Sequence, residues 1–182
     1  KKTIIEKMNM VVGSFFSEMG RELLDLFNDF DKNFDEVKDN FIDIGNWSKN
    51  DFEEKLETSK KIYYEVDLKK GDVDKLKNFL LEKREFLLRL LENPNLLEHD
   101  SFTNLLWAIT HLTEELAFRK DLKNCCKTDA SHLESDLKRA YVLLIYEWVE
   151  YMGHLKNKYP YLFSLAVRTN PFDPKASVEI KE

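Results

Sequence analysis

The stretch YVLLIYEWV, residues 141–149, decides the fold expected for this chain of 182 residues. Within it the apolar side chains nearly encircle a helix, which indicates contacts on more than one side. It belongs to a longer stripe whose members recur at three- and four-residue steps, the spacing of one helix face: Leu133, Leu137, Tyr141, Leu144, Trp148, Met152 and Leu155. This pattern predicts the central helix of a helical bundle.

The first 45 residues contain two further apolar stripes of helical spacing. Residues 3–30 predict one long amphipathic helix, with Gly13 and Gly20 as its weak points, and residues 34–45 predict a shorter one. Two interpretations of the first helix are open. Its apolar face is buried in the bundle core, or it serves for dimerisation or continues from a membrane-proximal segment.

A third helix is expected to begin at Ser48. Ser48 followed by Asp51 is typical of an N-terminal cap, and the helical pattern runs to about Tyr64. A glycine turn followed by aspartates then forms the clearest internal break, near residues 67–72. This break divides the chain into two candidate subdomains.

The next two helices are separated by a proline. The apolar stripe over residues 76–91 stops before Pro94, which disfavours helical geometry in the residue that precedes it. Asp100 or Ser101 can cap the following helix, expected over residues 102–119. Its main apolar face consists of Phe102, Leu105, Leu106, Ile109, Leu112 and Leu116.

The last part of the chain begins with a break at Pro160. A short apolar segment over residues 161–167 is expected to pack back, and residues 170–182 read as a largely extended tail. Only 5 glycines and 4 prolines occur, and β-type alternation is scarce. The sequence therefore predicts an all-α, mostly antiparallel bundle of about six helices that forms a single domain over residues 1–182.

Composition and charge exclude several classes of function. The formal net charge of −6, without a basic stripe, argues against a nucleic-acid partner, because phosphate binding depends on clustered lysine and arginine. The only cysteines, Cys125 and Cys126, are adjacent, so we expect free thiols in a reducing compartment. The uncharged run over residues 8–17 is far shorter than the roughly 20 residues of a membrane span.

No catalytic or metal-binding motif can be assigned from the sequence. His99-Asp100 resembles the dyad of helical metal-dependent phosphohydrolases, but the upstream histidine that those enzymes require does not occur before His99. No Glu-x-x-His motif of a di-iron bundle is present, and no serine elbow or phosphate-binding glycine loop appears. The sequence thus assigns no catalytic residue, metal ligand or cofactor, and it identifies no small-molecule ligand. Non-enzymatic function is favoured.

A second stripe on the helix over residues 102–119 is the best candidate site. It lies roughly opposite the leucine and isoleucine face and consists of Asn104, Trp107, His111, Glu114 and Phe118. In one interpretation this helix is buried on both sides within the bundle. In the other, the stripe is a partner-binding or ligand-binding surface with aromatic anchors. A rival class, a ligand-binding or metal-dependent helical enzyme, would use His111, Glu114 and His154.

Three segments carry a family resemblance: residues 4–20, IIEKMNMVVGSFFSEMG; residues 80–116, LLEKREFLLRLLENPNLLEHDSFTNLLWAITHLTEEL; and residues 159–173, YPYLFSLAVRTNPFD. Together they resemble an uncharacterised family of prokaryotic membrane-anchored proteins, some with ion-channel-like labels. The resemblance implies a soluble region that follows a hydrophobic membrane segment upstream of Lys1. It further implies a cytosolic interaction or regulatory domain at the cytoplasmic face of a membrane, with a protein partner or self-association.

Overall fold

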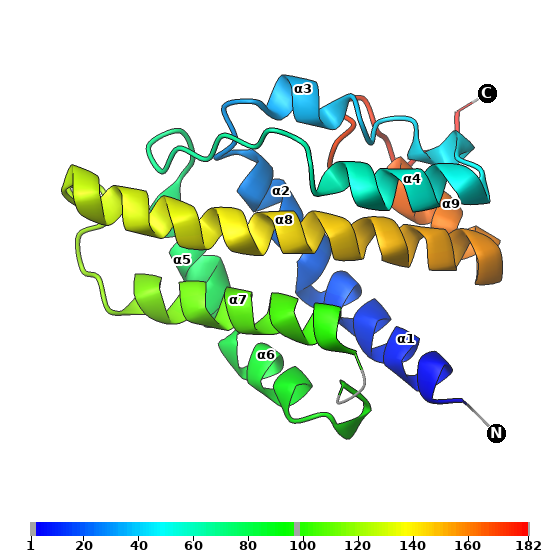
Figure 1. Cartoon of the computed structure of the whole chain (residues 1–182), viewed down its shortest axis with the longest axis horizontal. Coiled ribbons are helices and arrows are strands. Elements are labelled where there is room, and N and C mark those ends of the chain that lie inside the picture. The colour runs from blue at the N-terminus through cyan, green and yellow to red at the C-terminus, as the bar shows by residue number, and fades with distance from the viewer. Residues whose placement is uncertain (1–2, 97–98, 182) are drawn as a thin grey trace.

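The computed structural model describes residues 3–96 and 99–181. Its centre is the long helix α8, Lys127–Lys158, with α7, Asp100–Ala117, running antiparallel along one side and α4, Lys49–Ser59, along another (Figure 1). The described residues form helices and no strands, apart from one isolated bridge between Asp31 and Val66. The predicted all-α bundle is confirmed.

Helix α8 occupies the middle of the hydrophobic core. Every member of its predicted apolar stripe is buried, and Ala140, Ile145 and Val149 are buried beside them. The buried hydrophobic residues of all the main helices join in one cluster. The apolar ring read from residues 141–149 therefore corresponds to a helix that is packed on several sides, as expected.

The predicted helix over residues 3–30 is divided by a π-helical turn. Helix α1, Ile4–Phe15, passes into this turn at Phe16–Gly20, and α2, Arg21–Asn28, follows. Phe15 and Phe16, where this turn begins, are both buried in the core. From Val11 onward the apolar face is buried in the core, as one of the two interpretations proposed.

Two short helical segments lead from α2 to α4. They are α3, Phe34–Lys38, and the 3₁₀ turn η2, Ile44–Asn46. Ser48 forms the predicted cap of α4 through a complete capping box with Asp51. The expected extension of this helix to Tyr64 is wrong, because α4 ends at Ser59 and the buried Tyr64 hydroxyl donates to the Ser59 carbonyl at 2.6 Å.

The helix expected over residues 76–91 is interrupted once. Helix α5, Val73–Glu82, and α6, Arg84–Leu91, meet at Lys83, which leaves α-helical geometry. After the 3₁₀ turn η3, Pro94–Leu96, helix α7 begins with a cap that differs from the prediction. Neither Asp100 nor Ser101 is the capping residue. Instead, His99 Nδ1 accepts from the backbone N–H of Phe102 at 3.2 Å, the role that a serine or aspartate oxygen usually fills.

The C-terminal tail is anchored more firmly than the sequence predicts. Helix α9, Pro160–Arg168, packs back on α8, as expected for the short apolar segment. The predicted tail contains no helix over its described residues 170–181, and Phe172 within it is fully buried. Its ring centroid lies 4.7 Å from that of Phe41 and 5.1 Å from that of Trp148. Burial of one aromatic ring thus fixes the segment that follows α9.

A buried polar network joins α8 to the end of α2. The Tyr141 hydroxyl lies 2.8 Å from Asn28 Oδ1 and 3.1 Å from Asp31 Oδ2. Asp31 Oδ1 accepts from the backbone N–H groups of Asn33 and Glu65. Burial and the neighbouring Asp31 carboxylate raise the pKa of Tyr141, so its hydroxyl remains protonated and can donate.

None of the helices in the described part of the chain combines the length and the apolar content that crossing a bilayer requires.

Candidate functional site

The predicted site residues lie along the outer face of α7. Asn104, Trp107, His111 and Phe118 are exposed, with Trp107 57% and Phe118 85% accessible. The interpretation in which this helix is buried on both sides is therefore wrong for this face. The opposite face carries the buried leucines and isoleucine that pack against α8.

The three residues of the rival enzyme reading do not gather at one place. Glu114 forms an ion pair with Arg84 of α6. His154 lies near the far end of α8, where its Nδ1 is 3.5 Å from Asn9 Nδ2, and burial lowers its pKa. Only His111 belongs to a cluster of side chains that could act together.

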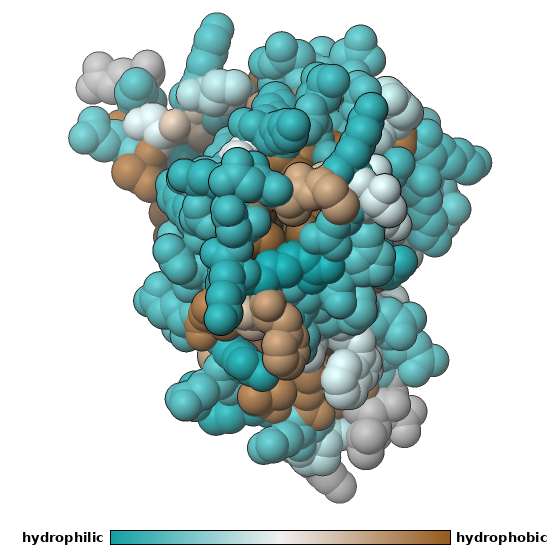
Figure 2. All heavy atoms as spheres, turned by 90° about the vertical axis from the view of Figure 1, so that its left-hand side faces the viewer, coloured by the Kyte–Doolittle hydropathy of each residue, from teal (hydrophilic) through white to brown (hydrophobic). Residues whose placement is uncertain are grey.

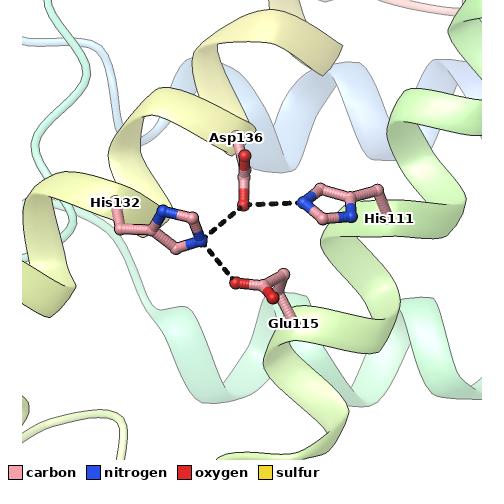
Figure 3. Close-up of side chains that lie close together, drawn as sticks. All are labelled: His111, Glu115, His132 and Asp136. Atoms are coloured by element: carbon pink, nitrogen blue, oxygen red, sulfur yellow. Dashed lines mark hydrogen bonds and ion pairs between the residues drawn. The ribbon is translucent and has the colours of Figure 1, made fainter.

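That cluster joins His111 and Glu115 of α7 to His132 and Asp136 of α8 (Figure 3). His111 Nε2 lies 3.2 Å from Asp136 Oδ2, and His132 Nε2 lies 3.4 Å from the same oxygen. His132 Nε2 also lies 2.6 Å from Glu115 Oε2. One nitrogen or oxygen atom from each of the four residues falls within 4.8 Å of the others.

Burial within the cluster is uneven. The Asp136 side chain is 5% exposed, whereas the side chains of His111 and His132 are 52% and 53% exposed. Asp136 Oδ2 is buried and forms no hydrogen bond with any residue that the structure describes. The cluster therefore has a buried carboxylate at its base and two imidazoles at its rim.

Two arginines orient the carboxylates of the cluster. Arg139 Nη1 donates to Asp136 Oδ1 at 3.0 Å, which leaves Oδ2 directed toward the histidines. Arg119 Nη1 donates to the Glu115 backbone carbonyl and lies 3.4 Å from Glu115 Oε2. Each carboxylate thus has one arginine partner that limits its rotation.

The connection between α7 and α8 brings the two pairs together. Each pair has residues at positions i and i+4, so both side chains lie on one face of their helix. Arg119, just after α7, also pairs with Asp129 in the first turn of α8. A hydrogen bond from Arg119 is the main reason that the pKa of Asp129 is lowered. This link sets the register in which His111 faces His132.

Sequence reasoning missed three of the four residues, although a local signal existed. Residues 111–115 read HLTEE and residues 132–136 read HLESD, so both follow the pattern His-Leu-x-x-acid. The pattern is short, and its meaning depends on whether two helices place the copies side by side. Imidazole nitrogen and carboxylate oxygen together can coordinate a divalent cation or exchange protons.

A second buried acid lies farther along α8. Glu147 is 2% exposed, and its Oε1 has no hydrogen-bond partner among the described residues. Burial raises the pKa of Glu147 to about 7, while a hydrogen bond from Ser101 opposes the rise and the nearby Glu150 adds to it. This carboxyl group is separate from the four-residue cluster, since it is about three helical turns beyond Asp136 on α8.

Comparison with known proteins gives a family relationship. Residues 4–168 match a family model described as uncharacterized protein MJ1433, C-terminal helical domain. A protein from Methanocaldococcus jannaschii, named Uncharacterized protein MJ1433, is 47% identical over 178 residues, which cover 98% of this chain and 71% of the relative. No solved structure matches the chain.

Proposed function

The chain belongs to the family of the MJ1433 C-terminal helical domain, and we propose that it acts as a non-enzymatic regulatory domain that binds a protein partner. The observation that carries this proposal is the exposed aromatic pair on α7. Trp107 and Phe118 lie on one helix face, about three turns or roughly 16 Å apart. Exposed tryptophan and phenylalanine side chains are typical anchors of protein interfaces.

The character of the surface supports a regulatory contact. Figure 2 shows the end of the molecule at which α7 and α8 are connected, and this end is mostly hydrophilic with separate small hydrophobic patches. Permanent subunit interfaces are larger and more continuously apolar. A partner that used a few aromatic anchors on such a surface would bind reversibly.

The resemblance noted for three sequence segments supports a cellular setting. We propose that the domain lies at the cytoplasmic face of a membrane, as part of a membrane-anchored and channel-associated protein. The complete gene product should then sediment with membranes. A complete gene product that stays soluble, monomeric and without a partner would contradict this proposal.

The α7 surface can be tested directly in the native host. Cross-linking and mass spectrometry of the tagged, complete gene product should identify a partner, or a second copy, linked near residues 104–118. The double variant Trp107→Ser/Phe118→Ser should lose that link. The matched control Tyr161→Ser/Ile180→Ser removes two equally exposed apolar side chains elsewhere and should keep it. Equal cross-linking of both variants would refute the assigned surface.

A further inference from the structure

We propose that His111, Glu115, His132 and Asp136 bind one divalent transition-metal ion of the zinc class. This site goes beyond the proposed partner surface and does not depend on it. The ion would join α7 to α8 through two ligands from each helix. Its ligands come from the sequence pairs HLTEE and HLESD, which the antiparallel packing of the two helices places opposite each other.

The separations between Asp136 Oδ2 and the two histidine nitrogens fit tetrahedral coordination. With zinc bonds of about 2.0–2.1 Å, neighbouring ligand atoms of a tetrahedron lie about 3.3 Å apart. Asp136 Oδ2 lies 3.2 Å and 3.4 Å from the two histidine nitrogens, and His132 Nε2 lies 2.6 Å from Glu115 Oε2. His132 and Glu115 would have to move apart by about 0.7 Å to bind one ion, and no pair of the four atoms is more than 4.8 Å apart.

The buried oxygen of Asp136 is an independent indication of a ligand. Oδ2 lies beside two imidazole nitrogens and is nearly inaccessible, yet neither nitrogen meets it with hydrogen-bond geometry. A buried carboxylate oxygen without a hydrogen bond is costly. An ion placed between Oδ2 and the two Nε2 atoms would remove that cost.

The surroundings hold the Asp136 carboxylate as metal ligands are usually held. Ligating side chains in metalloproteins are oriented by hydrogen bonds to their other atoms. Arg139 binds Oδ1 of Asp136 and leaves Oδ2 facing the histidines. Arg119 instead lies 3.4 Å from Oε2 of Glu115, the oxygen that faces His132, so only Asp136 is held through its other oxygen. The arginines also offset part of the negative charge, so the site does not require an ion in order to fold.

The donor set selects the class of ion. Magnesium and calcium prefer oxygen ligands alone, whereas two imidazoles with two carboxylates suit zinc and its first-row neighbours. Paired Glu-x-x-His motifs, which hold two irons in helical bundles, are absent from the sequence. One ion at one site is therefore expected.

The competing explanation is an ion-pair network without a metal. The contacts of His111 and His132 with Asp136 and Glu115 would then be ion pairs within the protein alone. The two explanations differ in what they predict on metal addition. A metal site binds one equivalent, whereas an ion-pair network binds none.

Titration calorimetry of the chelator-treated protein with zinc chloride tests the proposal. One ion should bind per chain, and Co²⁺ should give the visible absorption of tetrahedral cobalt without a thiolate charge-transfer band. His132→Asn should weaken zinc binding by at least about 100-fold, more than the loss usually caused by changing a residue that only orients a ligand. His132 is half exposed, so this variant should retain its helical circular dichroism.

Adjacent residues supply matched controls. Glu115→Gln should weaken binding, whereas Glu114→Gln, which alters the neighbouring glutamate paired with Arg84, should leave it unchanged. Cys125→Ser/Cys126→Ser should also leave it unchanged. Three results would each overturn the site. They are the absence of one-to-one binding, zinc binding by His132→Asn and Glu115→Gln that is as tight as that of the unchanged protein, and loss of zinc binding in the cysteine variant.

Discussion

Arg119 and Asp129 form a two-pronged ion pair that closes the connection between α7 and α8. Arg119 Nε donates to Asp129 Oδ2 at 2.8 Å, and Nη2 donates to Oδ1 at 2.7 Å. Such parallel pairs are more specific in geometry than a lysine contact. The link fixes how the first turn of α8 lies against the end of α7.

Asp129→Asn should lower the melting temperature at neutral pH. The pKa of Asp129 is lowered in the folded chain, chiefly by the hydrogen bond from Arg119, so the stabilisation is present above its ordinary value of 3.8. It is lost as the pH falls through the lower, folded-state value. Thermal unfolding of both proteins across this range should give curves that converge in acid. If the two melting temperatures still differ by the same amount below that pH range, the stabilisation does not come from the ionised Asp129 carboxylate.

Glu147→Gln should stabilise the protein above neutral pH. Burial raises the pKa of Glu147 from 4.5 to about 7, so the folded chain binds this proton more tightly than the unfolded chain. Stability should therefore fall as the pH rises from 4.5 through about 7. At about 1.4 kcal/mol for each tenfold change in proton affinity, the upper limit of the effect is about 3 kcal/mol. Urea unfolding at several pH values measures it, with Glu54→Gln as the exposed control.

Tyr141→Phe should destabilise the fold by about 1–3 kcal/mol. The change removes the hydroxyl that contacts Asn28 Oδ1 and Asp31 Oδ2, and it leaves these buried acceptors without that donor. Chemical denaturation should show the loss at unchanged m-value. Tyr161→Phe, at an exposed tyrosine, is the control and should have no effect. Equal stability of the two variants would mean that the network contributes nothing.

Gly20→Ala should be destabilising, whereas Gly13→Ala should be tolerated. A Cβ atom at Gly20 would lie 2.6 Å from the Phe15 ring and 2.7 Å from the Phe16 ring, both of which are buried. Overpacking of this kind costs about 1–3 kcal/mol. At Gly13 the nearest atom, 3.1 Å away, is the hydroxyl at the end of the partly buried Tyr151 side chain, and alanine favours the helix. The melting temperature of Gly20→Ala should fall, whereas that of Gly13→Ala should stay the same or rise.

Zinc should raise the melting temperature of the chain and not that of His132→Asn. At a free-ion concentration of about 100 times Kd, binding to the folded state alone adds about 2.7 kcal/mol. Differential scanning calorimetry of both proteins, with and without zinc, measures the two shifts. Equal thermal shifts in both proteins would place the ion elsewhere.

The predictable part of the fold depended on local pattern. The stripe around residues 141–149 required a helix buried on several sides, and Ser48 with Asp51 marked a start that is independent of distant contacts. The π turn was not predictable, since Phe15 and Phe16 also fit an uninterrupted amphipathic helix. Phe172 was missed because a single aromatic residue between prolines has no periodicity, and its burial depends on a space left by Phe41 and Trp148.

The candidate site was harder to predict for a related reason. Glu114 and Glu115 stand three and four residues after His111, and both spacings place a side chain on the same helix face. Packing makes the choice, since α6 presents Arg84 to Glu114, while α8 presents His132 to Glu115. His132 is 21 positions after His111. Its position beside His111 therefore depends on the length of the segment between α7 and α8 and on the ion pair between Arg119 and Asp129.

The unequal lengths of α7 and α8 give the cluster a mechanical consequence. Helix α8 has 32 residues and is about 48 Å long, whereas α7 has 18 residues and spans about 27 Å. The four-residue cluster therefore lies near one end of a rigid beam whose other end extends beyond α7 to α4 and α9 (Figure 1). The far end of α8 lies about 36 Å from the cluster, so a tilt of about 5° there would displace it by roughly 3 Å. The displacement from a change in the angle between α7 and α8 at the cluster would therefore be larger at the end of α8 that contacts α4 and α9.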